Sequence, residues 1–541
     1  MARTPLFRTL RRSLRLARLA AATGRSPSEI VQELEARRTF TRREFLRTSG
    51  AAAAGLGLAG CGLRGGRGGA PPGGGAGGDP QVVIVGAGIA GLTAGWRLKQ
   101  AGVAVRILEA QDRIGGRMFS LRNHFADGQV AELGGELIDT GHTHIRALAL
   151  ELELELNDLL EGETMESELW YFEGRRISEA ALVEAWGPVA ARIQADLDTL
   201  HSLDDWPWVT YRTPNGAEAL DRTTLAEWLA ATPMESWFRR LLDVGFTTEF
   251  GLETPAQSAL NLHFMIDPDP DEFVIYGESD ERYHVRGGND RIPRALADRL
   301  EAEIETGVRL EALRERADGS FELSVVRGAA SETLVAPSLV LALPFTLLRQ
   351  VQMDMELPSV KRRAIQELGY GTNAKLMMGF DDRVWRSRHG SSGSVLTDLP
   401  FQLTWETSRE QEGRHGILTN FTGGDHGTAL GEGTAAEQAR RAVADLERIF
   451  PGIEGTHLPG QAVRFHWPSH AWTRGSYASY LPGQWTGICG AEGERVRRLH
   501  FAGEHTSLDA QGFMEGGCET GERVAREILA DLGRAAAEPA A

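Results

Sequence analysis

A β-branched run followed at once by a glycine-rich turn constrains this chain more than any other feature. Residues 82–85 (Val-Val-Ile-Val) are typical of a strand buried on both faces of a parallel sheet. A helical segment to about Ala101 and a second strand over residues 104–108 complete a β–α–β unit. The turn between strand and helix is Gly86-Ala87-Gly88-Ile89-Ala90-Gly91. In such a turn the first glycine permits the tight bend, the second lets the backbone approach a pyrophosphate, and the third lets the helix pack on the sheet.

Glu109, at the end of the second strand, narrows the choice of nucleotide. A carboxylate at this position can accept hydrogen bonds from both ribose hydroxyls, and it disfavours a 2′-phosphate. The N-terminus of the preceding helix adds unpaired N–H groups and the positive end of a dipole for the phosphates. NAD and FAD share this half-site, so the turn alone leaves both open.

Motifs elsewhere in the chain favour FAD. A second glycine pair with an arginine, Gly115-Gly116-Arg117, follows soon after Glu109 and can reach the same pyrophosphate, and Gly134-Gly135 marks another turn. Near the C-terminus, residues 499–502 read as a strand that leads to Gly503-Glu504, and a helix begins soon afterwards at Phe513-Met514. A helix N-terminus directed at an isoalloxazine would stabilise negative charge on the reduced ring, whereas a nicotinamide needs no such site.

Together these motifs resemble those of the flavin-containing amine oxidoreductases over residues 80–533, a family that includes monoamine, polyamine and putrescine oxidases and L-amino-acid oxidases. The signatures are the glycine turn with Glu109, residues 108–117, residues 132–135, Gly287-Gly288 before a helix, and residues 501–506 leading to 512–516. The resemblance implies an α/β fold, with a Rossmann-like FAD-binding domain and an interleaved substrate domain of mixed β-sheet plus helices. The residues expected at the cofactor are Gly86, Ala87, Gly88, Ile89, Ala90, Gly91, Glu109, Ala110, Gly115, Gly116, Arg117, Gly134, Gly135, Glu136, Leu137, Val308, Gly503, Glu504, Phe513 and Met514.

The same resemblance implies four residues at the reaction centre. Lys375 looks like the lysine that holds a water against flavin N5, although by itself the sequence suggests an exposed lysine at a strand edge. Trp467 resembles the tryptophan beside the flavin, and Tyr477 and Phe513 resemble two aromatic walls that would align a neutral amine. Packing in an aromatic core is the alternative for these rings. Val308 matches the residue whose backbone contacts adenine.

Departures from the family pattern refine the expectation. Ser476 stands where mammalian monoamine oxidases carry the cysteine bonded to the flavin, so we expect non-covalent FAD. Snake-venom-type L-amino-acid oxidases place a carboxylate-binding arginine in a stretch that is Glu136 to Asp139 here, which favours amines, although an arginine elsewhere could serve. The sequence has no second strand and glycine motif for NADPH, which favours an oxidase over a monooxygenase.

We therefore predict an FAD-dependent oxidase that takes a hydride from the carbon beside an amine nitrogen to flavin N5. Molecular oxygen would be the acceptor, and the products would be an imine, then an aldehyde with ammonia or an amine, and hydrogen peroxide. An L-amino-acid oxidase giving an α-keto acid, a desaturase acting on C–C bonds and a non-catalytic flavoprotein are the alternatives. No metal is expected, because no paired Cys/His spacing suggests a zinc site.

Charge is unevenly distributed along the chain. Residues 1–47 hold twelve Arg and four Glu, so with −17 for the whole chain the remainder carries about −25. An acidic body argues against nucleic acid as a partner and attracts cationic substrates.

The basic N-terminal end contains Thr41-Arg42-Arg43-Glu44-Phe45-Leu46-Arg47, which resembles a twin-arginine export signal, with a solvated basic turn as the alternative. Residues 58–61, ending in Cys61, resemble a lipoprotein cleavage box. We expect export to the periplasmic or extracellular face of a membrane, with a possible lipid anchor.

Cysteine pairing and assembly receive little support from the sequence. If Cys61 is lipidated, Cys489 and Cys518 remain, too few for a disulfide framework. The oligomeric state cannot be predicted from the sequence.

The features above divide the chain into segments. The predicted segments are an export signal over 1–61, a flexible linker over 62–79, FAD-binding parts over 80–140, 281–340 and 466–533, a helical substrate part over 141–280, a second substrate part over 341–465 and a disordered tail over 534–541.

Overall fold

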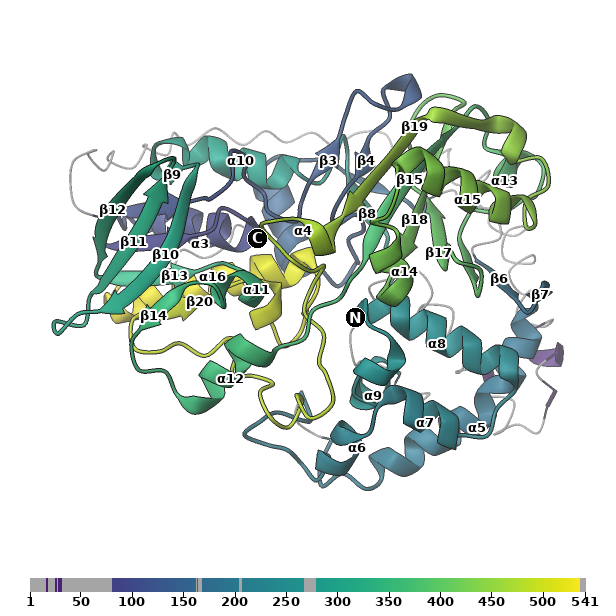
Figure 1. The fold of residues 1–541 in the computed structure, drawn as a ribbon, viewed down its shortest axis with the longest axis horizontal. Helices are drawn as coiled ribbons and strands as arrows, with labels where there is room; N and C mark the ends of the chain where they lie inside the picture. The colour runs from purple at the N-terminus through teal and green to yellow at the C-terminus, as the bar shows by residue number, and fades with distance from the viewer. Residues whose placement is uncertain are drawn as a thin grey trace, which may run out of the picture.

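The computed structural model describes residues 16–17, 25–26, 28–31, 80–161, 163, 168–203, 207–266 and 279–535. The predicted linker, Cys61, the twin-arginine motif and residues 536–541 lie outside the described residues. Within them, several sheets and helices form a mixed α/β fold, which confirms the predicted fold class (Figure 1).

A five-stranded parallel sheet carries the glycine turn. Its order is β20 (Leu499–Phe501), β13 (Ser338–Leu341), β1 (Val82–Val85), β2 (Val105–Leu108) and β9 (Ile304–Glu305). The helix α3 (Ile89–Gln100) packs on it beside α16 (Met514–Asp531), and α10 (Arg291–Arg299) lies next to α3. The approach of α16 to α3 is close, because a Cβ on Gly521 would lie 2.5 Å from the Ala90 carbonyl oxygen. The two ends of the folded chain therefore meet at this sheet (Figure 1).

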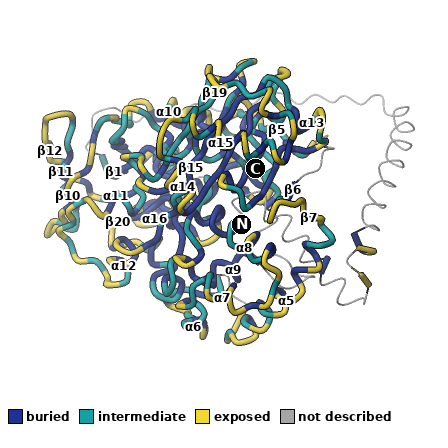
Figure 2. The backbone as a smooth tube through the Cα atoms, turned by 45° about the vertical axis from the view of Figure 1, so that its right-hand side comes forward, coloured by how far each residue is buried: buried dark blue, intermediate teal, exposed yellow. Residues whose placement is uncertain are grey.

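A four-stranded sheet lies beside it, on the left of Figure 1. Its order is β12 (Ala330–Ala336), β11 (Phe321–Arg327), β10 (Val308–Glu315) and β14 (Gln352–Asp354). The helices α11 (Phe345–Leu348) and α12 (Ser359–Glu367) follow in this half. Burial falls toward the outer strand β12, which alternates exposed and half-buried residues (Figure 2).

A seven-stranded mixed sheet forms the upper right of Figure 1. Its order is β19 (His457–His466), β15 (Ala374–Phe380), β18 (Gly416–Thr422), β17 (Leu403–Glu406), β16 (Val395–Thr397), β6 (Leu169–Phe172) and β7 (Arg175–Ile177). Every residue of β15 and β18 is buried, so their apolar runs are central strands. Its helices are α13 (Val384–Ser387), α14 (Gly424–Ala429) and α15 (Ala435–Glu447).

The segment predicted as a helical substrate part, residues 141–280, is only partly helical in its described residues. The helix α4 (Thr143–Glu151) packs on α16, and three short strands follow: β5 (Leu156–Asp158), which pairs with β8 (Tyr283–Val285), and β6 and β7 of the large sheet. Such short runs cannot be told from helix by periodicity alone. The helical layer proper is α5 (Glu179–Leu197), α6 (Glu218–Arg222), α7 (Leu225–Ala231), α8 (Ser236–Phe250) and α9 (Leu260–Met265).

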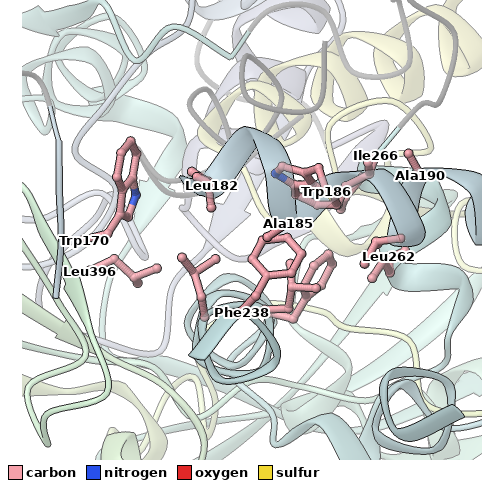
Figure 3. Packing of buried hydrophobic residues seen from close by; sticks show 14 of the residues in the cluster. Trp170, Leu182, Ala185, Trp186, Ala190, Phe238, Leu262, Ile266 and Leu396 are labelled. Carbon is pink, nitrogen blue, oxygen red and sulfur yellow. The ribbon is translucent and has the colours of Figure 1, made fainter. Parts of the chain in front are cut away.

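The core of this helical layer is aromatic. Trp186 of α5 and Phe238 of α8 are fully buried and pack edge to face, with ring centroids 5.1 Å apart. Leu262 of α9 belongs to the same cluster, and Trp170 of β6 joins it from the sheet (Figure 3). The helices are thereby fixed against the seven-stranded sheet.

Short elements complete the site region. These are β3 (Ser120–Leu121), β4 (Ala131–Glu132) and the single helical turns Trp467–Ser469 and Glu504–Thr506. The three segments predicted for the FAD-binding domain hold β1, β2, β9, β20 and all but the last residue of β13, while the exact boundaries stay a prediction.

Candidate active site

A cavity of about 650 Å³ is lined by residues of all three large sheets and by the start of α16. Ala87 and Gly91 are the two predicted site residues that do not line it. The predicted residues that do are Gly86, Gly88, Ile89, Ala90, Glu109, Ala110, Gly115, Gly116, Arg117, Gly134, Gly135, Glu136, Leu137, Val308, Lys375, Trp467, Tyr477, Gly503, Glu504, Phe513 and Met514. The structure thus brings together motifs that span more than 400 residues of sequence.

The glycine turn forms one wall of this cavity. Gly86 has φ +109°, and a Cβ on it would lie 2.6 Å from the Ala342 carbonyl oxygen. Gly91 allows no side chain either, since a Cβ there would lie 2.0 Å from the Gly86 carbonyl oxygen. At Gly88, by contrast, the nearest atom to an added Cβ is the Gly116 Cα at 3.9 Å. Only bare backbone therefore borders the cavity at Gly88 and Gly116, ahead of the α3 N-terminus, as a diphosphate requires.

Glu109 is fixed at the cavity wall by two backbone groups. Its Oε2 accepts the N–H of Ala87 and its Oε1 accepts the N–H of Gln111, both at 2.9 Å. Burial raises the pKa of Glu109. Oε1 also accepts a long hydrogen bond from Gln111 Nε2 at 3.4 Å, so Oε2 has the more accessible lone pair for a ribose hydroxyl. The N–H of Val308 donates to the Glu109 carbonyl oxygen at 2.8 Å, so a backbone contact of Val308 with adenine would use its carbonyl.

The C-terminal motifs reach the cavity through Glu504 and α16. Glu504 accepts hydrogen bonds from Arg117 Nη1 at 2.7 Å and from the N–H of Gly512 at 2.8 Å. Arg117 Nη1 also donates to the carbonyl of Ser476 at 2.9 Å. Part of the Arg117 guanidinium is therefore used within the protein, and its expected reach to the pyrophosphate stays a prediction.

Lys375 lies in β15 with its ammonium group against the Gly134-Gly135 turn. Nζ donates to Glu136 Oε2 at 2.7 Å, to the Gly134 carbonyl at 2.8 Å and to the Glu132 carbonyl at 3.1 Å. An ammonium has three N–H donors, and all three have protein acceptors here. A water at flavin N5 would have to share one of these protons or displace an acceptor.

Glu136, which is expected at the cofactor, lines the cavity and directs its side chain toward Lys375. Its Oε1 accepts hydrogen bonds from Trp405 Nε1 at 2.9 Å and from Thr407 Oγ1 at 2.8 Å, while Oε2 binds Lys375. Burial opposes its charge, but the Lys375 ammonium holds the pKa of Glu136 below its usual range. Its side chain therefore belongs to the Lys375 end of the cavity.

The predicted aromatic residues are each anchored by a named contact. Trp467 donates from Nε1 to the Leu133 carbonyl at 2.9 Å, which holds its ring against the glycine turn at residue 134. The Tyr477 hydroxyl donates to the Glu249 carbonyl at 2.8 Å, near the end of α8. Phe513 precedes α16, and its ring contacts His142 edge to face, with centroids 5.1 Å apart.

Sequence reasoning missed three further aromatic residues of the cavity, Trp405, Phe421 and Trp472. Trp405 of β17 and Phe421 of β18 both line it, with ring centroids 5.5 Å apart. No motif marks them, and only the strand alternation that places Leu403 and Trp405 on one face could have suggested them. Asp139 and Glu281 also line the cavity and were not assigned to it.

Comparison with known proteins agrees with this geometry. The family model described as "Flavin containing amine oxidoreductase" matches residues 89–529. The chain belongs to the flavin-containing amine oxidoreductases.

Relatives within the flavin-containing amine oxidoreductases are distant but match over most of their length. Amine oxidase [flavin-containing] A of Sus scrofa is 26% identical over 475 residues, covering 84% of this chain and 85% of that protein. L-amino acid dehydrogenase of Synechocystis is 27% identical over 469 residues, covering 83% of this chain and 94% of that protein. Among solved structures, cyclohexylamine oxidase from Brevibacterium oxydans superposes with a TM-score of 0.73 at 23% identity, covering 84% of this chain and 100% of that chain. Putrescine oxidase bound to putrescine superposes with a TM-score of 0.68 at 22% identity, covering 84% of this chain and 99% of that chain.

Family membership implies a flavin cofactor, FAD, and the cavity fits it. The open backbone at Gly88 and Gly116 suits a diphosphate, Glu109 suits a ribose, and Lys375 and Trp467 stand at the expected ring end. Among the described residues, no group of three or more His, Cys, Asp or Glu could hold a metal ion. In the same part of the chain, no helix is long and apolar enough to cross a membrane.

Proposed function

We propose that this chain is an amine oxidase with non-covalent FAD. An amine RCH2NH2, oxygen and water would give the aldehyde RCHO, ammonia and hydrogen peroxide, through an imine that hydrolyses. The observation that carries the proposal is that one cavity joins a diphosphate-binding turn and Glu109 to Lys375, Trp467, Tyr477 and Phe513.

The residues of this chain would prepare the amine rather than react with it. The rings of Trp405, Phe421, Tyr477 and Phe513 give the cavity apolar surface that excludes water, which favours the neutral amine over its ammonium form. Held between such rings, the α-carbon has few orientations available. Bound FAD supplies the two-electron acceptor for the hydride and passes the electrons to oxygen.

Anaerobic mixing tests the proposal directly. The full chain, purified with its FAD, is mixed without oxygen with alkylamines, aralkylamines, diamines and L-amino acids, and flavin absorbance is followed. Bleaching by amines, with peroxide and aldehyde formed when air is admitted, is the expected result. If no amine bleaches the flavin, the proposed function is wrong.

An L-amino-acid oxidase is the second candidate, and the similarity to L-amino acid dehydrogenase supports it equally. A substrate carboxylate would need a cation. Among the described residues, three arginines line the cavity. Arg117 pairs with Glu504, and Arg309 pairs with Glu311. The third is Arg474, which follows the Trp467 segment and is the candidate for binding the carboxylate. An α-keto acid product from an L-amino acid would identify this activity.

Location is a separate proposal that rests on sequence alone. We infer that residues 41–47 direct export by the twin-arginine route, and that Cys61 carries a lipid. Fractionation of cells that express the full chain tests both points. A protein found in the cytoplasm, or one that stays water-soluble after export, would exclude the route or the lipid respectively.

A further inference from the structure

The side chain of Glu136 joins three parts of the active site. Its two oxygens accept hydrogen bonds from Lys375 in β15, from Trp405 in β17 and from Thr407 just after β17. Thr407 Oγ1 is in turn 2.5 Å from Thr419 Oγ1 of β18. Glu136 itself follows the Gly134-Gly135 turn, so one carboxylate ties this turn to the seven-stranded sheet.

Glu136 also completes the bonding of Lys375. The side chains are only 5% and 6% exposed, and Oε2 lies 2.7 Å from Nζ. The other two Lys375 donors go to neutral carbonyls of Glu132 and Gly134. Glu136 is thus the one hydrogen-bond acceptor of this ammonium, among those recorded in the described residues, that carries a charge.

The pair changes the electrostatics of the flavin-ring end of the cavity. Lys375 and Glu136 sum to zero, as do Arg117 and Glu504. The positive end of α16 remains, because its first-turn acid Glu515 is held away by the N–H groups of His144 and Ile145 at 2.9 and 2.8 Å. Without Glu136, the Lys375 ammonium would place an uncompensated positive charge in the cavity wall. The low dielectric constant there makes such a charge act strongly on a neighbouring flavin ring.

We propose that Glu136 is a positioning residue that fixes the Lys375 ammonium and cancels its charge, so that it lowers the reduction potential of the bound flavin. The inference rests on the family placement of the flavin ring beside Lys375, and it holds for any substrate. Because reduction adds negative charge to the ring, an uncompensated Lys375 would stabilise the reduced state, and an uncompensated Glu136 would oppose it.

Four variants and one measurement test this inference. The midpoint potential of the bound flavin is measured with a chemical reductant and a redox dye, with no amine present. Glu136→Gln should favour the reduced state by at least tenfold, about 30 mV upward for a two-electron couple. Lys375→Met should shift the potential downward, and the double variant should return close to the parent. Glu136→Asp keeps the charge and should restore most of the parent value.

A matched control separates this effect from a general loss of charge. Glu311→Gln removes a carboxylate from the same cavity at the β10 wall, and its potential should match the parent. If Glu136→Gln and Lys375→Met lower the melting temperature but leave the potential unchanged, Glu136 is merely structural and the inference fails. If one variant does not fold, the shift of the other decides, since each has its own predicted sign. If no amine is a substrate, the proposed function is wrong, but the predicted shifts in potential are unaffected.

Discussion

Arg117 and Glu504 are 387 residues apart in sequence, and their side chains meet at 2.7 Å on the wall of the cavity. Glu504 is the more buried of the two, at 7% side-chain exposure against 25% for Arg117. It also accepts the N–H of Gly512, just ahead of α16. The C-terminal segment is thereby joined to the segment after the glycine turn, so the cavity depends on a contact between distant parts of the chain.

Replacing Glu504 with Gln should weaken this junction. The Arg117 guanidinium would lose its charged partner in a mostly buried place, so we expect the free energy of unfolding to fall by about 2 to 3 kcal/mol. Urea unfolding of the FAD-loaded protein measures it. Glu494→Gln is the control, because its partner Arg212 is 67% exposed and such pairs contribute about 0 to 1 kcal/mol. Equal effects of both changes would contradict the role given to Glu504.

Replacing Glu109 with Ala should weaken FAD binding. The carboxylate is held by the N–H groups of Ala87 and Gln111, and its hydrogen bonds to a ribose would contribute about 1.5 to 3 kcal/mol, or at least tenfold in Kd. Titration of the flavin-free protein with FAD measures the Kd. A change below twofold would show that the ribose lies elsewhere.

The β–α–β unit and its glycine turn could be predicted from the sequence because their signals are local. The role of Glu136 could not be predicted. The Gly-Gly-Glu motif indicates a turn near the cofactor, but the direction of the Glu136 side chain is set by Trp405 and Thr407, about 270 residues further along. Those partners reach it through the pairing of β15, β17 and β18, which no local pattern specifies. The short strands β6 and β7 were missed for a related reason, since β6 pairs with β16, which is distant in sequence, and β7 pairs with β6.

The flavin should leave the protein when the chain is denatured. Ser476 occupies the place of the flavin-linked cysteine, and its hydroxyl donates to Asn373 Oδ1 at 2.7 Å. We therefore expect all of the yellow colour in the supernatant after acid precipitation, measured as absorbance near the flavin maximum. Colour that stays with the precipitate would mean a covalent link at another residue.

Two changes at Tyr477 separate its ring from its hydroxyl. Tyr477→Phe keeps the ring and loses the hydroxyl hydrogen bonds to the carbonyls of Glu249 and Thr248, so kcat/KM for the best amine should fall by less than about tenfold. Tyr477→Ala removes one aromatic wall, worth about 1.5 kcal/mol or more, and should reduce kcat/KM more than tenfold. Steady-state peroxide assays measure both. If the two variants were equally impaired, the hydroxyl and not the ring would be what positions the substrate.

Lys361 allows a pH test of buried charge away from the active site. It lies in α12 at 1% exposure, its Nζ donates to the Glu492 carbonyl at 2.8 Å, and burial lowers its pKa to about 7. In the unfolded chain the pKa is about 10.4, so the unfolded state binds more protons between these values and stability falls as pH drops from about 10 to about 7. Lys361→Met removes this penalty.

The free energy of unfolding of Lys361→Met should therefore exceed that of the parent, and by more at lower pH. We expect a gain of about 2 to 4 kcal/mol near pH 7, after allowing for the lost hydrogen bond, and little or none near pH 10. Urea unfolding across this range measures the difference. Lys99→Met serves as the control, because Lys99 is 38% exposed and pairs with Glu303, and it should show no such trend. A gain that was constant with pH would mean that the pKa of Lys361 is the same in the folded and unfolded states, and that the variant only improves packing.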